Sequence, residues 1–266
     1  MTGTYAPRFQ TTADLSPALS AALLQFGLAL ADTKHRMGLR LSEWSHSAPA
    51  LEAAVAASAM TQDELGHARS LFAMLRDLPG ALSDLNPETD MIREKHYNPR
   101  FLDAAWQSWM EVIAVNVMLD SALNVVFEAA RQSQFGPLGG RVGKILQEEH
   151  FHRIFGESWL ARLAMGNPAT RDRLQAALDR AGPVASAWLG PPGDPALAAL
   201  VEAGIFSASS TQLRENWLRR VAPLLEKYGL APPAAQHDWS KWNVERREVN
   251  SDPRRHTKTH EEEAHV

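Results

Sequence analysis

The stretch TQDELGHARSLF, at residues 61–72, decides the fold because its pattern returns as ILQEEHFHRIFG at residues 145–156. In each stretch, an acidic residue precedes a glutamate, and a histidine follows that glutamate three positions later. The two sets are Asp63, Glu64 and His67, and Glu148, Glu149 and His152. Residues at i and i+3 share one face of a helix, so each glutamate can point in the same direction as its histidine. Two such pairs on facing helices are the pattern with which a four-helix bundle holds metal ions in its core.

The segments around the two stretches are predicted to be long helices. Apolar residues recur there at spacings of three and four, with few helix breakers. The four long helices are expected at residues 16–44, 49–78, 100–133 and 140–165, a fifth at about 169–189, and one or two shorter ones up to about 229. We find no alternation typical of strands. Long helices joined by short turns pack as antiparallel neighbours, which predicts an all-α four-helix bundle with additional C-terminal helices.

The two ends of the chain are expected to lie outside this helical domain. Residues 1–14 are interpreted as an N-terminal tail, and residues 15–230 hold the predicted helices. Residues 231–266 are polar, charged and rich in histidine. We interpret them as an extended or partly disordered C-terminal arm.

The composition excludes several kinds of site and partner. The 266 residues contain no cysteine, so no disulfide, thiolate metal site or cysteine nucleophile can form. The net charge is −4 and no basic stripe is present, which argues against a nucleic-acid partner. The chain shows no apolar run long enough to span a membrane and no apolar leader. We therefore expect no membrane partner and a cytoplasmic protein.

The Glu-x-x-His motif is weak by itself, because roughly one copy is expected by chance in a chain of this composition. The chain holds four copies, at Glu43/His46, Glu64/His67, Glu149/His152 and Glu262/His265. The first copy falls on a predicted turn, and the last lies in the polar tail, so both are expected at the surface. Only the two middle copies lie inside long helices, which makes them the candidate metal ligands.

A further ligand is predicted from the height of each residue in the bundle. In an antiparallel hairpin, residues equally far from the turn lie level with one another. The turn near 135 lies fourteen residues before Glu149, and counting back fifteen residues from the turn reaches Asp120. Asp120 interrupts an otherwise apolar helix, which is costly unless the carboxylate has a partner. The rival, Glu111, lies nine residues away, about 13 Å along the axis, so it is at the wrong level.

The same rule leaves the first helix without an obvious ligand. The window level with Glu64 is ALADTKH, at residues 29–35, and it holds Asp32, Lys34 and His35 but no glutamate. Five ligands are therefore well placed, and Asp32 is the candidate for the sixth.

The acids that precede the two glutamates are predicted to support the histidines. A histidine bound to a metal usually donates its other N–H group to a carboxylate. Asp63 and Glu148 each precede a candidate ligand, so each can reach the histidine of the opposite helix.

The two stretches resemble the catalytic A subunit of the bacterial ring 1,2-phenylacetyl-CoA epoxidases, which have a ferritin-like di-iron fold. The Gln-Asp-Glu-x-Gly-His signature of that subunit is matched at 62–67, and its Glu-Glu-x-Phe-His signature at 148–152. Softer similarity occurs in FGP (135–137), WLGPPGD (188–194) and HDWSKWN (237–243). The segment LRLSEWSHSAPALE (39–52) instead resembles the family's C subunit, which is a structural partner without the metal ligands.

The resemblance implies a set of iron ligands, three of them also catalytic carboxylates. The ligands are Glu64, His67, Asp120, Glu149 and His152, and the catalytic carboxylates are Glu64, Asp120 and Glu149. The glutamate that the family carries on its first helix falls on Lys34, which cannot bridge two irons while protonated. Asp32 lies about 200° round the helix from Lys34, and His35 is nearer in angle. We therefore expect Lys34 to lie beside the ligands, and the centre to bind either two irons or one.

The leading hypothesis is a monooxygenase subunit that activates O₂ for insertion into the ring of an aromatic acyl-CoA. Electrons come from a separate reductase, because the chain lacks a dinucleotide-binding glycine loop and lacks cysteine for an iron–sulfur cluster. By analogy with the family, we expect the chain to pair with a homologous structural subunit or to self-associate. Two alternatives remain open: a non-catalytic structural subunit or paralogue with one metal or none, and a ferritin-like iron or manganese oxidase.

Overall fold

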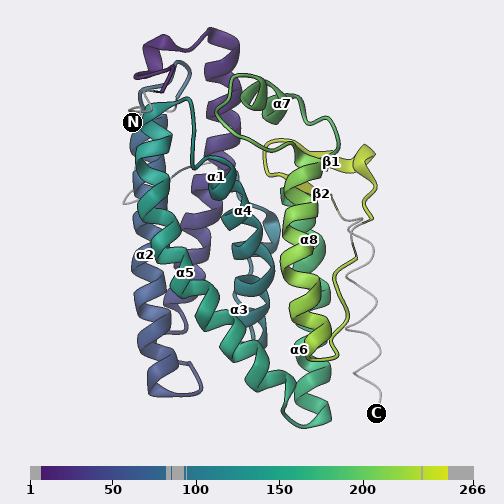
Figure 1. The fold of residues 1–266 in the computed structure, drawn as a ribbon. Helices are drawn as coiled ribbons and strands as arrows, with labels where there is room; N and C mark the ends of the chain where they lie inside the picture. The colour runs from purple at the N-terminus through teal and green to yellow at the C-terminus, as the bar shows by residue number, and fades with distance from the viewer. Residues whose placement is uncertain (1–6, 82–84, 86–92, 94, 235, 251–266) are drawn as a thin grey trace, which may run out of the picture.

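The structure is a computed structural model, and it describes residues 7–81, 85, 93, 95–234 and 236–250 (Figure 1). Long helices dominate these residues, and the all-α, ferritin-like fold predicted from the sequence is confirmed. The bundle consists of α1 (Pro17–Ser42), α2 (Leu51–Leu75), a composite third helix and α5 (Gly136–Ala164). The third helix is built from α3 (Trp109–Val115), a π-helical turn labelled η4 (Asn116–Asp120) and α4 (Ser121–Ala129).

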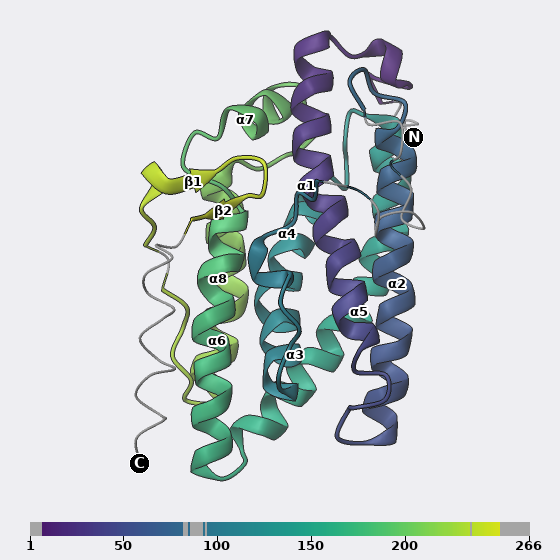
Figure 2. The ribbon, with the colours of Figure 1, turned by 180° about the vertical axis from the view of Figure 1, so that it is seen from behind.

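Three further helices extend the bundle on the side away from α2. They are α6 (Pro168–Trp188), α7 (Pro195–Glu202) and α8 (Ser210–Lys227). Figures 1 and 2 both show α5 running from beside α2 to the far end of the molecule, where the chain turns into α6. Short 3₁₀ turns lie at Thr12–Asp14, Arg100–Leu102 and Trp239–Lys241.

Several helices begin with a capping side chain followed by proline. A capping oxygen satisfies one of the free N–H groups of the first turn, and proline there lacks only an N–H that needs no partner. The cap-and-proline pairs are Ser16/Pro17 at α1, Asn167/Pro168 at α6 and Asp194/Pro195 at α7.

The third helix differs from the expected range of 100–133. Residues Arg100–Leu102 form a separate turn, and the continuous helix begins only at Trp109. Asp103 is held outside the helix, because it accepts from Asn98 Nδ2 at 2.9 Å and from Arg246 Nη1 at 3.3 Å. Arg246 lies far away in the sequence, so helical periodicity cannot reveal this contact.

The described part of the predicted C-terminal arm packs against the helices at residues 236–250. Its strands β1 (Trp242–Asn243) and β2 (Glu248–Val249) pair antiparallel, with Trp242 opposite Val249. Arg247, between them, is 1% exposed. Its Nη1 lies 2.9 Å from Asp194 Oδ2, and its Nε donates to the Trp188 carbonyl at 2.7 Å. This buried cation therefore fastens the arm to the end of α6.

The composite third helix is the centre of the core. Trp109–Ala129 is long and apolar enough to cross a membrane by those two criteria, but 83% of this stretch is buried inside the protein. Core helices pass the same test, so its apolar character is explained by the bundle around it. Asp120, which ends the π-helical turn, is the buried acidic residue of this stretch, whereas Glu111 and Glu128 are not buried.

Candidate metal centre

The four bundle helices bring six charged or titratable side chains together in the core. Lys34 comes from α1, and Asp120 comes from the π-helical turn of the third helix. The repeated pairs lie on α2 and α5, as their spacing predicts. No member is more than 4% exposed: Lys34 0%, Glu64 0%, His67 2%, Asp120 3%, Glu149 0% and His152 1%.

Four of these side chains could hold a metal ion as they stand. Glu64, Asp120, Glu149 and His152 each offer one ligand atom, and these atoms lie within 4.8 Å of one another. Bonds of about 2.0–2.2 Å place opposite ligands roughly 4.4 Å apart across an ion, so little contraction is needed. Three carboxylates with imidazole nitrogen form a donor set that suits iron or manganese.

Lys34 places its ammonium group among the same carboxylates. Lys34 Nζ lies 2.5 Å from Asp120 Oδ1, 2.5 Å from Glu149 Oε1 and 3.1 Å from Glu64 Oε1. The sequence predicts Lys34 beside the ligands. The structure shows it at the centre of the carboxylate cluster, in contact with all three acids.

The pKa values of these groups reflect burial and mutual attraction. Burial opposes the charge on Lys34, but Asp120, Glu149 and Glu64 outweigh it and raise the pKa of Lys34 well above its ordinary value. Burial would raise the pKa of Asp120, but Lys34 and His152 hold it far below its ordinary value. For Glu64, burial dominates over the attraction of Lys34, and its pKa is raised. Because its pKa is raised, the ammonium group of Lys34 stays charged at neutral pH.

Both histidines turn Nε2 away from the carboxylate cluster, toward an acid on the opposite helix. His67 Nε2 lies 2.8 Å from Glu148 Oε2, and His152 Nε2 lies 3.2 Å from Asp63 Oδ2. These are the cross-helix contacts that the repeated pattern predicts. When Nε2 donates to the acid, the neutral ring keeps Nδ1 as a lone-pair donor, the tautomer that a metal requires.

The Nδ1 atoms of both rings face the cluster. His67 Nδ1 lies 3.3 Å from Glu149 Oε1, and His152 Nδ1 lies 3.5 Å from both Glu64 Oε1 and Asp120 Oδ2. Burial lowers the pKa of His152, but its contacts with Asp120, Asp63 and Glu64 outweigh burial and raise that pKa to about 12. Burial likewise opposes the charge on His67, but Glu149 raises its pKa above the ordinary value.

The π-helical turn gives Asp120 a neighbour that sequence reasoning missed. Asn116 Nδ2 donates to Asp120 Oδ2 at 3.3 Å. The Asn116 side chain fits only because residue 156 on α5 is glycine: a Cβ there would overlap Asn116 Oδ1. π-helical turns are frequent at functional sites, since the extra residue redirects a side chain. The only signal in the sequence is a glycine one turn after His152.

The structure does not bring Asp32 into the centre. Asp32 is 2% exposed, but its Oδ1 lies 2.5 Å from Arg93 Nη2, and its Oδ2 accepts from the Tyr97 N–H at 2.7 Å. It faces these partners because it lies about 200° round α1 from Lys34.

Another acidic residue considered as a ligand also lies away from the centre. Glu111, at the wrong level in the bundle, pairs with Arg180 at 2.8 Å on the surface. The tail pair Glu262/His265 lies outside the described residues.

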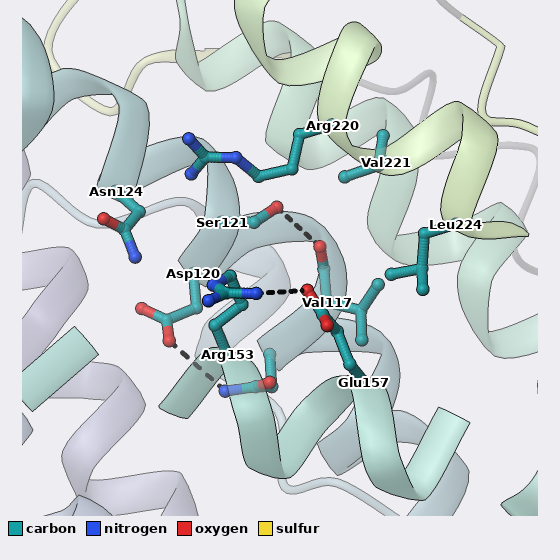
Figure 3. A pocket seen from close by; sticks show the side chains of 10 residues that line it. Val117, Asp120, Ser121, Asn124, Arg153, Glu157, Arg220, Val221 and Leu224 are labelled. Carbon is teal, nitrogen blue, oxygen red and sulfur yellow. Dashed lines mark hydrogen bonds and ion pairs between the residues drawn. The ribbon is translucent and has the colours of Figure 1, made fainter. Parts of the chain in front are cut away.

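A narrow cavity leads toward the centre from the side of α8. Its volume is ≈ 20 Å³, room for about one water molecule, and Asp120 and Asn116 are among its lining residues (Figure 3). A wider surface depression of ≈ 380 Å³ shares Asn124, Arg153 and Arg220 with this cavity. Arg153 pairs with Glu157 at 3.0 Å, as Figure 3 shows. The depression, called the polar mouth below, therefore lies over the cavity that Asp120 lines.

Comparison with known proteins shows relatives of both kinds that the motifs suggest. The family model for phenylacetic acid catabolic proteins matches residues 6–259. The chain is 27% identical to the A subunit of 1,2-phenylacetyl-CoA epoxidase from Escherichia coli (strain K12) over 192 residues, which cover 71% of this chain and 62% of that protein. It is 24% identical to the C subunit of the same enzyme over 158 residues, which cover 59% of this chain and 64% of that protein. The chain thus spans less than two thirds of the length of each relative.

Proposed function

Because this chain belongs to the phenylacetic acid catabolic protein family, we propose that it is an iron-binding subunit of a multicomponent oxygenase acting on an aromatic acyl-CoA. The observation that carries this proposal is the buried quartet of Glu64, Asp120, Glu149 and His152, with ligand atoms within 4.8 Å of one another. Buried carboxylates are costly, so three of them gathered in the core need cations to compensate their charge.

The chain's own residues would hold and orient the metal. Glu64, Asp120, Glu149 and His152 supply the ligands, and His67 stands beside them on α2. Asp63 and Glu148 keep the imidazoles oriented through Nε2. Iron bound there would supply the redox chemistry that activates O₂. The burial of all six groups keeps bulk water away from them and strengthens their electrostatic interactions.

The substrate would approach through the polar mouth beside α8. Arg131, Arg153 and Arg220 line the surface depression together with Glu128 and Glu157, which pair with Arg220 and Arg153. Guanidinium groups bind phosphate oxygens in pairs, so a phosphate would have to displace these carboxylates. The phosphates of an acyl-CoA suit such a mouth. The ≈ 20 Å³ cavity below it is too small for an aromatic ring, so α8 or the third helix would have to move when the acyl group enters.

Partners would supply electrons and shield the bundle. A separate reductase is required, since the chain has no cysteine and no dinucleotide-binding glycine loop.

Exposed apolar side chains lie on α2 and α5: Leu51 (78% exposed), Val55 (61%), Phe151 (68%) and Ile154 (44%). We propose that a homologous subunit or a second copy of this chain covers them. We also expect a cytoplasmic location, consistent with such a reductase partner.

A second candidate function is a structural role without catalytic activity. Lys34 favours it, since its ammonium group already compensates three carboxylates that would otherwise need metal. Conversely, a structural role does not require two imidazoles that each keep a buried Nδ1 without a hydrogen-bond partner in the described part of the chain.

The two functions can be separated with isotope-labelled oxygen. The iron-loaded chain, with its co-purifying subunits and a reductase, is given phenylacetyl-CoA and ¹⁸O₂, and the acyl-CoA product is analysed by mass spectrometry. We expect one ¹⁸O atom in the product and its loss in Glu149→Gln. The control Glu111→Gln, altered at a surface ion pair, should keep activity. Absence of label from the intact, metal-loaded complex would favour the structural role.

A further inference from the structure

We propose that the Lys34 ammonium group permanently takes the place of one of two metal ions, so that the centre binds a single divalent ion. The inference rests on the proposed metal-binding role of the centre, and not on the oxygenase reaction. Its basis is the position of Lys34 Nζ, within 2.5–3.1 Å of an oxygen from each of the three carboxylates. Among the described residues, no second lysine or arginine pairs with these three acids.

The two glutamates divide their oxygens as carboxylates between two cations do. Glu64 and Glu149 each place Oε1 on Lys34. The other oxygen, Oε2, is buried in both residues and has no hydrogen-bond partner within the described ranges. The Nδ1 atoms of His67 and His152 are also buried and make no hydrogen bond within the described ranges, only longer contacts of 3.3–3.5 Å with carboxylate oxygens. Lone-pair atoms without partners are costly to bury. A cation held by Glu64, Asp120, Glu149 and His152 could satisfy the free atoms of Glu64, Glu149 and His152, whereas His67 lies outside that group of ligands.

The charges in the centre limit it to one such cation. Three carboxylates and one ammonium group leave two negative charges when both imidazoles are neutral. One divalent ion neutralises this charge. Two divalent ions beside the ammonium group would leave two positive charges in the buried site. Only Asp63 and Glu148 would oppose these charges, and their side chains are partly exposed (32% and 25%), so solvent weakens their effect.

Lys34 cannot easily exchange its position with another residue of α1. On one side, Asp32 is held by Arg93 and by the Tyr97 N–H. The adjacent Thr33 donates to the Ala29 carbonyl at 2.6 Å and accepts from Trp188 Nε1 at 3.1 Å. The contacts with Arg93, Tyr97 and Trp188 fix the rotation of α1 about its axis. The Lys34 side chain is 0% exposed, so its ammonium group has no contact with solvent in this position.

Metal stoichiometry tests this inference without any turnover. The full-length protein is loaded with Mn²⁺ under anaerobic conditions, freed of loosely bound metal, and measured by elemental analysis and electron paramagnetic resonance. We expect about one ion per chain, with the six-line signal of an isolated Mn²⁺ ion. Lys34→Glu, which restores a carboxylate, should bind about two ions that are magnetically coupled. The control Lys241→Glu reverses a surface charge on the arm and should still bind one.

Each result decides the inference. Two coupled ions in the unaltered protein would overturn it, and so would no bound ion in a correctly folded protein. Should Lys34→Glu fail to fold, the stoichiometry of the unaltered chain still gives the answer. The oxygenase proposal stands or falls separately: one bound ion with no labelled product would retain the single-ion centre and reject the activity.

Discussion

Replacing Lys34 with methionine should destabilise the metal-free protein strongly. Methionine keeps the length and apolar stem of lysine but removes the ammonium group, which contacts Asp120 and Glu149 at 2.5 Å and Glu64 at 3.1 Å. Three carboxylates would remain buried with only the two imidazoles to compensate them. Removing one partner of a buried ion pair costs about 3–5 kcal/mol. For a chain of this size, this corresponds to a decrease in melting temperature of about 6–20 °C.

The loss should depend on pH in a direction that the pKa shifts dictate. Burial already raises the pKa of Glu64 in the unaltered protein, despite the opposing effect of Lys34. Without Lys34, the buried carboxylates bind protons more readily in the folded state than in the unfolded state. A group whose folded pKa is raised favours folding as pH falls. Lys34→Met should therefore lose more stability at pH 8 than at pH 5.

Urea unfolding of the metal-free protein, followed by circular dichroism, measures this effect. Lys241→Met is the matched control, because Lys241 forms only an exposed pair with Asp238 at 3.5 Å. Exposed pairs contribute less than about 1 kcal/mol. A loss for Lys34→Met no larger than for this control, at pH 8, would refute the view that Lys34 compensates the carboxylate cluster.

Three other predictions follow from the surroundings of the centre and from the arm. Gly156→Ala should push Asn116 out of its place and weaken metal binding at least tenfold in a titration, whereas Gly143→Ala, on the same helix with nothing within 4 Å of the added Cβ, should bind metal normally. Arg247→Met should cost about 3–5 kcal/mol in urea unfolding, because it leaves a buried carboxylate without its cation; unchanged stability would contradict the fastening of the arm. Metal binding at pH 7 should release protons and tighten as pH rises, because the pKa of His152 is raised to about 12 and a metal needs its neutral ring. Calorimetry in buffers of different ionisation enthalpy measures that release, and a buffer-independent enthalpy would count against it.

The sequence predicts those features that repeat along the helices. Apolar spacing locates the four long helices, because each buries one face against the others. The level of Asp120 follows from its distance to the turn, since the rise of a helix per residue is nearly constant. Its burial at 3% beside Glu149 agrees with that estimate. The cross-helix contacts of Asp63 and Glu148 likewise follow from a repeated pattern on two facing helices.

Features that depend on distant contacts could not be predicted in this way. The third helix starts late because partners outside it hold Asp103. Asp32 is a candidate ligand by sequence distance, but Arg93, sixty-one residues away, pairs with it instead. The support of Asp120 by Asn116 depends on a π-helical turn and on space beside Gly156, neither of which leaves a periodic signal.

Anomalous X-ray diffraction from crystals of the iron-loaded protein, recorded at the iron absorption edge, tests the single-ion centre most directly. The expected result is one anomalous peak per chain, bound by Glu64, Asp120, Glu149 and His152. Lys34 Nζ should remain within hydrogen-bonding distance of the two glutamates. Two peaks per chain, with the Lys34 side chain displaced from the carboxylates, would contradict the claim that an ammonium group replaces one metal in this bundle.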